Sequence, residues 1–502
     1  MSAPGLDSFV SWFQRNNGFI DTQIMGFCTF APSEGGRGAV ALKDIPEGQV
    51  LFSIPRSLTL SIRNSSLPKL LGPQLWREKQ LDKGWIGLIL CMMWENAQGP
   101  SSKWAEYLEI LPKKFDTPMF WDENDLQELK GTYVVDKLGK EDAERDYNEK
   151  LLPIVRSRPD LFSAESIVTY YSLEQYHIMG SRILSRSFDV ERWEGDSEND
   201  SDQNNIAADT SVGSAIDVDL PAPSSTNDSD PDEQNSDDED EEDQVDVSMV
   251  PVADLLNARY GTENAKLFYE PTELKMLTTK PIAVGEQIWN TYGDLPNAEL
   301  LRRYGHVDLM ELSGGGKGNP GDVVEIRADV VVSVLFERPG TFPENRIKAI
   351  IDWYLEEGGD DVLVIEADME LPPQLLTLIR LFLLSPEEFK KAQDKGKPPK
   401  NKVDLPLLDI AIRVLQLRSD EFLTSVDTDE ALLVSDLTLN KYHATVVRLG
   451  EKKILWGALK KAKELRSALV EQSKGTAGSE TTSSKNKRKI TSDGPPSKKS
   501  KK

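Results

Sequence analysis

A long acidic segment in the middle of the chain is the feature that most constrains its fold. The stretch from Glu194 to Asp246 contains 20 Asp and Glu residues, no Lys or Arg and no aromatic residue. Such a stretch buries too little apolar surface to offset the entropy lost on ordering it, so we expect it to be disordered. Because patterned sequence lies on both sides, we interpret residues 194–247 as a loop inserted into one domain.

The net charge of the 502-residue chain is −25, and this charge is unevenly distributed. The acidic segment carries most of it, whereas Lys474–Lys502 carries nine basic and two acidic residues. The remainder is only mildly acidic, so we expect no requirement for nucleic acid.

The basic tail, which we also expect to be disordered, contains the clusters Lys485–Lys489 and Lys498–Lys502. This spacing resembles a bipartite nuclear-import signal and predicts an import receptor as a partner. The expected location is the nucleus, with the cytoplasm as a second location. The alternative for such clusters is nonspecific binding of nucleic acid.

Scarcity of cysteine and histidine excludes several classes of protein. Two cysteines, Cys28 and Cys91, cannot form a disulfide scaffold or a four-cysteine zinc site, and we expect no metal. The sequence contains no GxxxxGK[ST], GxSxG, HExxH or CxxC motif, which sets aside the enzyme classes that depend on them. The longest apolar stretch, Trp85–Trp94, is too short to span a bilayer, so we expect no membrane partner.

Two similar patterns predict β-turn-β units on either side of the acidic segment. Gly38–Pro55 and Leu274–Gly293 each contain two short β-rich runs and the spacing Lys-x-Ile-x-x-Gly. Between these units, apolar patterns predict helices at Trp85–Glu95, Trp104–Leu111 and Ser166–Ser185.

The C-terminal region has the apolar spacing of amphipathic helices, for example at Leu407, Ile410 and Val414. We interpret these as packing helices, with a groove for a protein partner as the alternative. The sequence therefore predicts an α+β fold followed by an all-α domain. The expected bounds are 1–310 for a domain of short β-sheets with a helical insert at about 60–185, 311–322 for a Gly-rich linker, 323–473 for the helical domain and 474–502 for the tail.

Four short segments have residue types that are typical of a binding site. They are Gly35–Gly38 (GGRG), Ser185–Phe188 (SRSF), Val250–Asn257 (VPVADLLN), and Asn290–Gly293 (NTYG) with the nearby Tyr304. Each has an ordinary structural explanation when taken alone. These are a flexible turn, a surface Arg at a helix end, buried polar residues that lock the fold, and core tyrosines.

Taken together and in order, the four segments resemble the SET-domain methyltransferases of the RuBisCO large-subunit methyltransferase-like class. The longer matching stretches are GEQIWNTYG and NAELLRRYGHV, and Ser102–Trp121 is similar to the inserted helical part of this class. The resemblance reaches about Val470, excludes the acidic segment and the tail, and is greatest for the fungal ribosomal lysine methyltransferases. It implies a split SET domain, a helical substrate-binding domain and S-adenosylmethionine as the cofactor.

The resemblance also implies roles for individual residues. Those that would contact the cofactor are Gly35, Gly36, Arg37, Arg186, Asn257, Ala258 and Tyr304. The substrate-lysine pocket would comprise Ser185, Asp254, Tyr292 and Tyr304, with the hydroxyl of Tyr292 as the catalytic group. One position departs from the family, because Ala258 stands where the usual Asn-His pair has His. Backbone contacts can persist there, whereas a hydrogen bond from the imidazole is lost.

The expected activity is S-adenosylmethionine-dependent N-methylation of lysine in a basic protein, with a protein of the large (60S) ribosomal subunit as the expected substrate and a monomer as the expected state. In-line methyl transfer requires aligned reactants and no metal. Three alternatives stay open: a weak or silent SET-like protein that acts as a chaperone for basic proteins, methylation of a histone or another non-ribosomal lysine, and methylation of histidine. The acidic segment is either a solvated spacer or an electrostatic trap for basic substrates.

Overall fold

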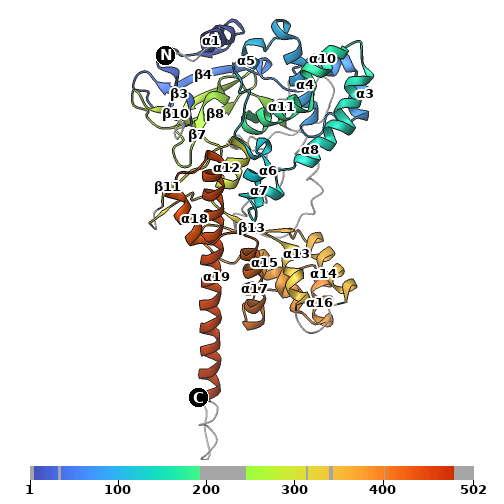
Figure 1. Cartoon of the computed structure of the whole chain (residues 1–502), viewed down its shortest axis with the longest axis vertical. Coiled ribbons are helices and arrows are strands. Elements are labelled where there is room, and N and C mark those ends of the chain that lie inside the picture. Colours follow the sequence, from blue (N-terminus) through green and yellow to red (C-terminus); the bar gives the residue numbers. More distant parts are fainter. Residues whose placement is uncertain are drawn as a thin grey trace, which may run out of the picture. The chain divides into compact units, whose positions relative to one another are not determined.

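The computed structural model describes residues 5–31, 35–192, 245–312, 315–337, 343–400 and 402–479 (Figure 1). Nearly all of the acidic segment and the tail from residue 480 lie outside the described residues, and so do the predictions of disorder for them. The chain divides into two compact units, one formed by residues 1–324 and 421–454 and the other by residues 325–420 and 455–502.

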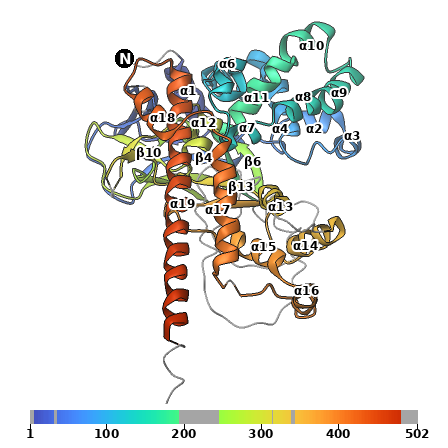
Figure 2. The same cartoon turned by 60° about the horizontal axis from the view of Figure 1, so that its bottom comes forward.

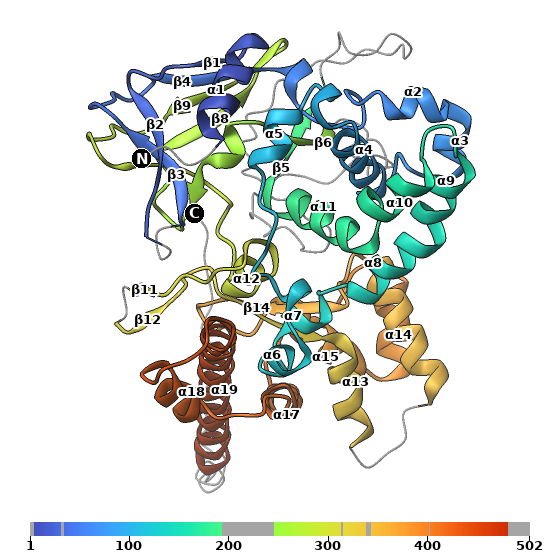
Figure 3. The same cartoon turned by 45° about the horizontal axis from the view of Figure 1, so that its top comes forward.

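Two four-stranded sheets organise the first unit (Figure 3). One sheet has the strand order β1-β4-β9-β8 and the other has the order β2-β3-β10-β7. All neighbours are antiparallel except β10 and β7, which are parallel. The strands are β1 (Phe19–Ile20), β2 (Met25–Thr29), β3 (Arg37–Ala41), β4 (Val50–Pro55), β7 (Asn257–Ala258), β8 (Ala265–Tyr269), β9 (Glu273–Thr278) and β10 (Gln287–Asn290).

The two predicted β-turn-β units are β3 with β4 and β9 with β10, and they pair with each other. Strand β10 lies beside β3, and β9 lies beside β4. The turns of the two units also meet, because Ile45 and Ile282 form an antiparallel bridge. Segments more than 200 residues apart in sequence therefore form one folded core.

The acidic segment is attached to a β-hairpin of the first unit. Strand β5 (Ser187–Glu191) pairs with β6 (Val245–Met249) in continuous antiparallel register. The last pair before the insertion joins Glu191 to Val245, so the chain leaves and re-enters the hairpin at one point. The first unit therefore continues through both sides of the insertion.

Helices of the first unit cluster beside the sheets (Figure 3). Helix α1 packs against α5 and β1, and the buried α4 packs against α10 and α11. Their bounds are α1 (Leu6–Arg15), α2 (Leu67–Leu71), α3 (Pro73–Glu78), α4 (Ile86–Ala97), α5 (Ala105–Ile110), α6 (Glu123–Gln127), α7 (Tyr133–Asp136), α8 (Lys140–Asp146), α9 (Leu152–Ser157), α10 (Ala164–Tyr170), α11 (Leu173–Arg186) and α12 (Asn297–Tyr304).

One predicted helix is two helices in the structure. The expected helix at Ser166–Ser185 is interrupted at Ser172, whose backbone is extended with φ −72° and ψ 161°. The Ser172 hydroxyl accepts a hydrogen bond from the backbone N–H of Gln175. This is the arrangement of a helix N-cap, so α11 begins there as a new helix.

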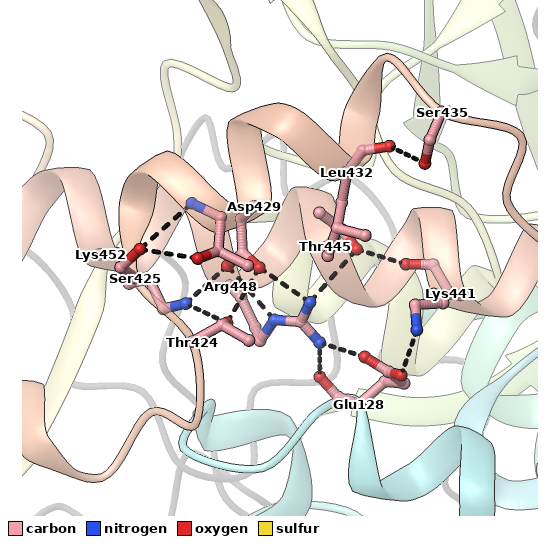
Figure 4. A network of polar contacts seen from close by, with 11 residues as sticks. Glu128, Thr424, Ser425, Asp429, Leu432, Ser435, Lys441, Thr445, Arg448 and Lys452 are labelled. Carbon is pink, nitrogen blue, oxygen red and sulfur yellow. Dashed lines mark hydrogen bonds and ion pairs between the residues drawn. The ribbon is translucent and has the colours of Figure 1, made fainter.

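Residues 421–454 belong to the first unit, which differs from our assignment of this stretch to the C-terminal domain. It contains α18 (Val426–Leu433) and the beginning of α19 (Leu439–Ser479). The buried Asp429 accepts hydrogen bonds from Arg448 at 3.0 Å and Lys452 at 2.6 Å (Figure 4). Arg448 also donates to the carboxylate of Glu128 at 2.8 Å. The Arg448–Glu128 contact, together with the packing of Ala444 and Val447 in one apolar cluster with residues of the helical insert, joins this stretch to the first unit.

The second unit is mostly helical, rather than all-α as expected (Figure 2). Helix α17 packs against α13 and α15, and the predicted apolar positions Leu407, Ile410 and Val414 are buried. A two-stranded sheet of β13 (Val324–Arg327) and β14 (Val362–Ile365) adds to the helices. The helices are α13 (Ala328–Phe336), α14 (Glu344–Glu356), α15 (Pro373–Leu383), α16 (Pro386–Gln393), α17 (Leu405–Asp420) and the remainder of α19.

Two further segments, the Gly-rich linker and the end of α19, contain regular structure that the sequence did not predict. The Gly-rich linker carries the short strands β11 (Met310–Glu311) and β12 (Lys317–Gly318), which pair with each other. Helix α19 continues to Ser479, so the first residues of the expected disordered tail are helical. Within the described ranges, no helix combines the length and the apolar character needed to cross a membrane.

Candidate active site

All four sequence segments meet at one cavity of about 330 Å³ in the first unit. This volume falls within the range of ligand pockets. The residues that line it are Gly35, Arg37, Ile110, Pro112, Arg186, Asp254, Leu255, Asn257 and Tyr292. A larger cavity of about 680 Å³ lies beside α4, α5 and α11, but none of the four segments lines it. We therefore take the smaller cavity as the candidate site.

The GGRG segment closes against Asn257 in a way that requires glycine. Gly35 has φ +93° and Gly36 has φ +67°, in the left-handed region that favours glycine. A Cβ atom at Gly35 would lie 2.6 Å from the side chain of Asn257. The Asn257 carboxamide is itself held, because its Nδ2 donates to Oε1 of Gln287 at 2.7 Å. The loop and the Asn257 carboxamide thus form a fixed cradle.

Arg37 ties the same loop to the helical insert. Its Nη1 and Nη2 atoms both donate to the backbone oxygen of Ile110, each at 3.0 Å. Burial of the guanidinium, together with the nearby charge of Arg186, lowers the pKa of Arg37. An arginine has so high an ordinary pKa that it remains charged, so the cavity wall is cationic on this side.

Asp254 is fully buried at the cavity wall and has one paired carboxylate oxygen. Its Oδ2 accepts a hydrogen bond from the hydroxyl of Tyr107 at 2.9 Å. Burial raises the pKa of the Asp254 carboxyl, and this effect is partly opposed by Arg186 and by the Tyr107 hydrogen bond. Val252, just before this turn, has φ +76°, a strained conformation for a β-branched residue. Such strain is common at functional sites.

Two polar atoms at this wall have no partner among the described residues. They are Oδ1 of Asp254 and Nε of Arg186, and both are buried. Arg186 donates instead to the backbone oxygen of Asp254, and its Nη1 lies 3.9 Å from Oδ2 of that residue. Because an unpaired buried polar group costs free energy, these atoms indicate a site that a polar ligand completes.

Tyr292, which lines the cavity, forms a stacked aromatic pair with Tyr304. Their ring centroids are 4.1 Å apart and the planes differ by 4°. The hydroxyl of Tyr292 lies 3.5 Å from the backbone oxygen of Leu256. Burial raises the pKa of Tyr292 to about 12, so its hydroxyl keeps its proton at neutral pH. Tyr304 is not a lining residue, and it contacts the cavity residue Tyr292 through this stack.

The structure does not bring every predicted residue to the cavity wall. The Ser185 hydroxyl donates to the backbone oxygen of Ser181 in its own helix, at 2.7 Å, and Ser185 does not line the cavity. Ala258 is buried in β7, where it pairs with Asn290 of β10, and it too is not a lining residue. Gly36 adjoins the cavity between the lining residues Gly35 and Arg37. The roles of Ser185 and Ala258 stay predictions.

Sequence reasoning missed Tyr107, Ile110 and Pro112. All three lie in the Ser102–Trp121 stretch, whose similarity to the helical insert of the class was the available signal. Tyr107 is 147 residues from Asp254, and an apolar spacing pattern does not indicate such a contact.

Comparison with known families decides the assignment. Residues 36–293 match the model of the SET domain, and residues 348–455 match the model described as Rubisco LSMT substrate-binding. The chain belongs to the SET-domain family. Ribosomal lysine N-methyltransferase 4 of Saccharomyces cerevisiae is 31% identical to it over 392 residues, which cover 75% of this chain and 71% of that protein. N-lysine methyltransferase SETD6 of Homo sapiens is 27% identical over 453 residues, covering 84% and 83%.

Solved structures agree with this SET-domain fold. The structure of Rubisco LSMT bound to AdoMet matches with a TM-score of 0.64 and 18% identity, and 93% of each chain is covered. The SET domain of LSMT bound to lysine and AdoHcy matches with a TM-score of 0.62, at 18% identity and with 93% and 92% covered. The predicted family and α+β fold are thus confirmed.

This SET-domain protein is a protein-lysine N-methyltransferase. S-adenosylmethionine, the cofactor expected from the sequence, is bound in the Rubisco LSMT structure that the chain matches in fold. The residues at the cavity fit that cofactor. Open space lies where a Cβ atom of Gly36 would be, next to the cavity, and the unpartnered Nε of Arg186 is a hydrogen-bond donor that needs an acceptor.

Proposed function

We propose that this SET-domain protein methylates a lysine of a protein of the large ribosomal subunit. The observation that carries the proposal is the convergence of Arg186, Asp254 and Tyr292 on one cavity, in a chain similar to a ribosomal lysine methyltransferase over three quarters of its length. The match at residues 348–455 to a substrate-binding model supports a protein as the substrate.

In this proposal, the cofactor is held by the GGRG loop and the residues facing it. Gly35, Gly36 and Arg37 hold it from one side, and Asn257 with the backbone at Ala258 holds it from the other. Arg186 contributes its unpartnered Nε, and Tyr304 supports the site through Tyr292. The bound cofactor supplies a methyl group on a positively charged sulfur.

Tyr292 orients the substrate amine in this proposal. Its hydroxyl is protonated at neutral pH. It can donate a hydrogen bond to an amine in the cavity or accept one from it. The stacked ring of Tyr304 fixes the Tyr292 ring, so little rotational freedom is left to lose on alignment. A lysine amine, whose free pKa is about 10.4, must lose its proton before it reacts, and transfer into a desolvated cavity lowers that pKa.

The substrate proposal is tested by transfer of a labelled methyl group. The full-length protein is incubated with labelled S-adenosylmethionine and purified ribosomal subunits, core histones or other basic proteins, and labelled residues are located by mass spectrometry. We expect label on a lysine of a large-subunit protein and much slower labelling with Tyr292→Phe. Label on histones alone, or on histidine, would replace the ribosomal lysine as the substrate. No label on any protein would favour a binding role for basic proteins.

We further propose that the protein acts as a monomer and enters the nucleus through an import receptor that binds its basic tail. The support is the spacing of Lys485–Lys489 and Lys498–Lys502 in the sequence. A fluorescent fusion of the full chain should accumulate in the nucleus, and replacement of both clusters by alanine should abolish this accumulation. Equal distribution of the two fusions would contradict the proposal.

A further inference from the structure

Tyr107 is a buried residue of α5 that contacts the site from outside the cavity. Its side chain has no exposed surface, and its hydroxyl donates to Oδ2 of Asp254 at 2.9 Å. Helix α5 also brings Ile110 to the cavity wall, and Ile110 accepts both hydrogen bonds of Arg37. Tyr107 thus connects the helical insert to Asp254, the one carboxylate among the described residues that line the cavity.

The ring of Tyr107 is fixed by aromatic residues of α1. Trp12 stacks on it with a centroid distance of 6.3 Å and an interplanar angle of 7°, and Phe9 lies 6.1 Å away. Trp12 is in turn held because its Nε1 donates to the backbone oxygen of Lys103 at 2.8 Å. The phenol hydroxyl therefore has a defined position, and α1 lies outside the SET-domain match at 36–293.

The hydrogen bond from Tyr107 leaves Asp254 half satisfied. A phenol has one proton to donate, and it serves Oδ2. Oδ1 is buried without a partner among the described residues, while Nη1 of Arg186 donates to the backbone oxygen of Asp254. A charged amine carries three donors, and its hydrogen bond to a carboxylate oxygen is stronger than one between neutral groups.

We propose that Tyr107 is a positioning residue, which holds Oδ2 of Asp254 and thereby leaves Oδ1 to accept a hydrogen bond from the ε-ammonium group of the substrate lysine on binding, before that group loses its proton. This inference rests on the proposed function in placing Asp254 in the lysine pocket. Helix α1 supports the site in this proposal, because its Trp12 stacks on the ring of Tyr107.

The charges that face Asp254 decide how the site responds to pH. They come from Arg186 on α11 and Arg37 on β3, with the hydroxyls of Tyr107 on α5 and Tyr292 after β10. Asp254 must be ionised to hold an ammonium group. The Tyr107 hydrogen bond favours the ionised form, so its removal raises the pKa of Asp254 and moves the loss of lysine binding to higher pH.

The test compares Tyr107→Phe with Tyr147→Phe in the full-length protein. Tyr147 is also buried and donates at 2.9 Å, but its acceptor is the backbone oxygen of Tyr171. Binding of Nα-acetyl-lysine amide to the protein saturated with S-adenosylhomocysteine is measured by NMR titration between pH 5 and pH 9. KM and kcat are measured with a protein substrate that the enzyme methylates. For Tyr107→Phe we expect roughly tenfold weaker binding of the probe, a higher KM and an acid limb shifted to higher pH. For Tyr147→Phe we expect the wild-type profile.

A second substitution protects the test against loss of folding. Incorporation of 3-fluorotyrosine at position 107 keeps the shape of the ring and strengthens the hydroxyl as a donor, so the acid limb should move to lower pH. Identical pH profiles for wild type, Tyr107→Phe and the fluorinated protein would overturn the inference. If the probe binds in a Tyr107-dependent manner while no ribosomal protein is methylated, the inference stands and the ribosomal substrate is wrong.

Discussion

Ile45 and Ile282 exchange both of their backbone hydrogen bonds, with N···O distances of 2.8 and 2.9 Å. They occupy the same position in the two Lys-x-Ile-x-x-Gly patterns. Each is followed three residues later by a glycine with positive φ, Gly48 at +77° and Gly285 at +84°. The exchange places β3 beside β10, and this is why the GGRG and NTYG segments reach the same cavity although about 250 residues separate them.

Substitution of Gly35 tests the glycine cradle. Gly35→Ala combines backbone strain with a Cβ 2.6 Å from the Asn257 side chain, and we expect weaker binding of S-adenosylhomocysteine, by at least tenfold, in a calorimetric titration. Gly285→Ala is the matched control, because Gly285 has a similar φ of +84° and open space around the added atom. It should cost about 1 kcal/mol of stability or more, with unchanged affinity. Equal affinity for the two variants would remove the cradle from cofactor binding.

Substitution of Tyr292 separates catalysis from binding. We expect Tyr292→Phe to lower kcat roughly 10²-fold, since a hydroxyl that orients the amine is lost while the stack on Tyr304 persists. The affinity for S-adenosylhomocysteine should stay within about twofold. Tyr170→Phe, a half-buried tyrosine on α10 that does not line the cavity, should retain full turnover. An active Tyr292→Phe protein would exclude the hydroxyl from the reaction.

The buried ion pairs of Asp429 predict a pH dependence of stability. Burial of Asp429 acts to raise its pKa, but the hydrogen bonds from Arg448 and Lys452 outweigh this effect and hold the pKa below its ordinary value of 3.8. The stabilisation is therefore complete above that value and is lost as pH falls through the lower folded pKa.

Asp429→Asn should lower the free energy of unfolding by about 3 kcal/mol at pH 7, because it leaves two buried cations incompletely paired. Its stability should then change less than that of wild type when pH is lowered through this range. Asp427→Asn, on the exposed side of the same helix, should change stability by at most about 0.5 kcal/mol. Denaturant unfolding of the three proteins checks both statements, and equal losses in the two variants would contradict them.

Removal of the acidic segment tests whether it attracts basic substrates. Because β6 begins at Val245 and Asp246 pairs with Arg63 and Arg192, the deletion should span 194–243 and be closed by a short Gly-Ser linker. We expect the KM for a basic protein to rise several-fold at low salt and kcat to stay constant, with the difference vanishing at high salt. The same KM in both proteins at low salt would identify the segment as a spacer.

Patterns within short stretches of sequence predicted those elements whose formation depends on neighbouring residues. The two β-turn-β units, the helix α4 and the buried stripe of α17 follow from apolar spacing and from glycine in turns. The break at Ser172 was missed because one serine cap within a long apolar pattern is a weak signal. The inclusion of residues 421–454 in the first unit depends on contacts between residues distant in sequence, such as Arg448 with Glu128, and spacing carries no information on such pairing.

The candidate site divides in the same way. Gly35, Arg37, Arg186, Asp254, Asn257 and Tyr292 were predicted from the order of four motifs, and they line one cavity. Tyr107 was missed because its role exists only through a contact across 147 residues. Ser185 was placed by its motif in the lysine pocket, whereas its hydroxyl bonds to the preceding turn of α11, a local option that serines in helices often take.

The pairing of Glu191 with Val245 has a practical consequence for engineering. Because the two chain ends lie opposite each other at the end of a hairpin, another sequence can be inserted there without distorting the hairpin. A reporter domain, an affinity tag or an acidic stretch of another length can replace residues 194–243 there, and the cavity residues keep their supports.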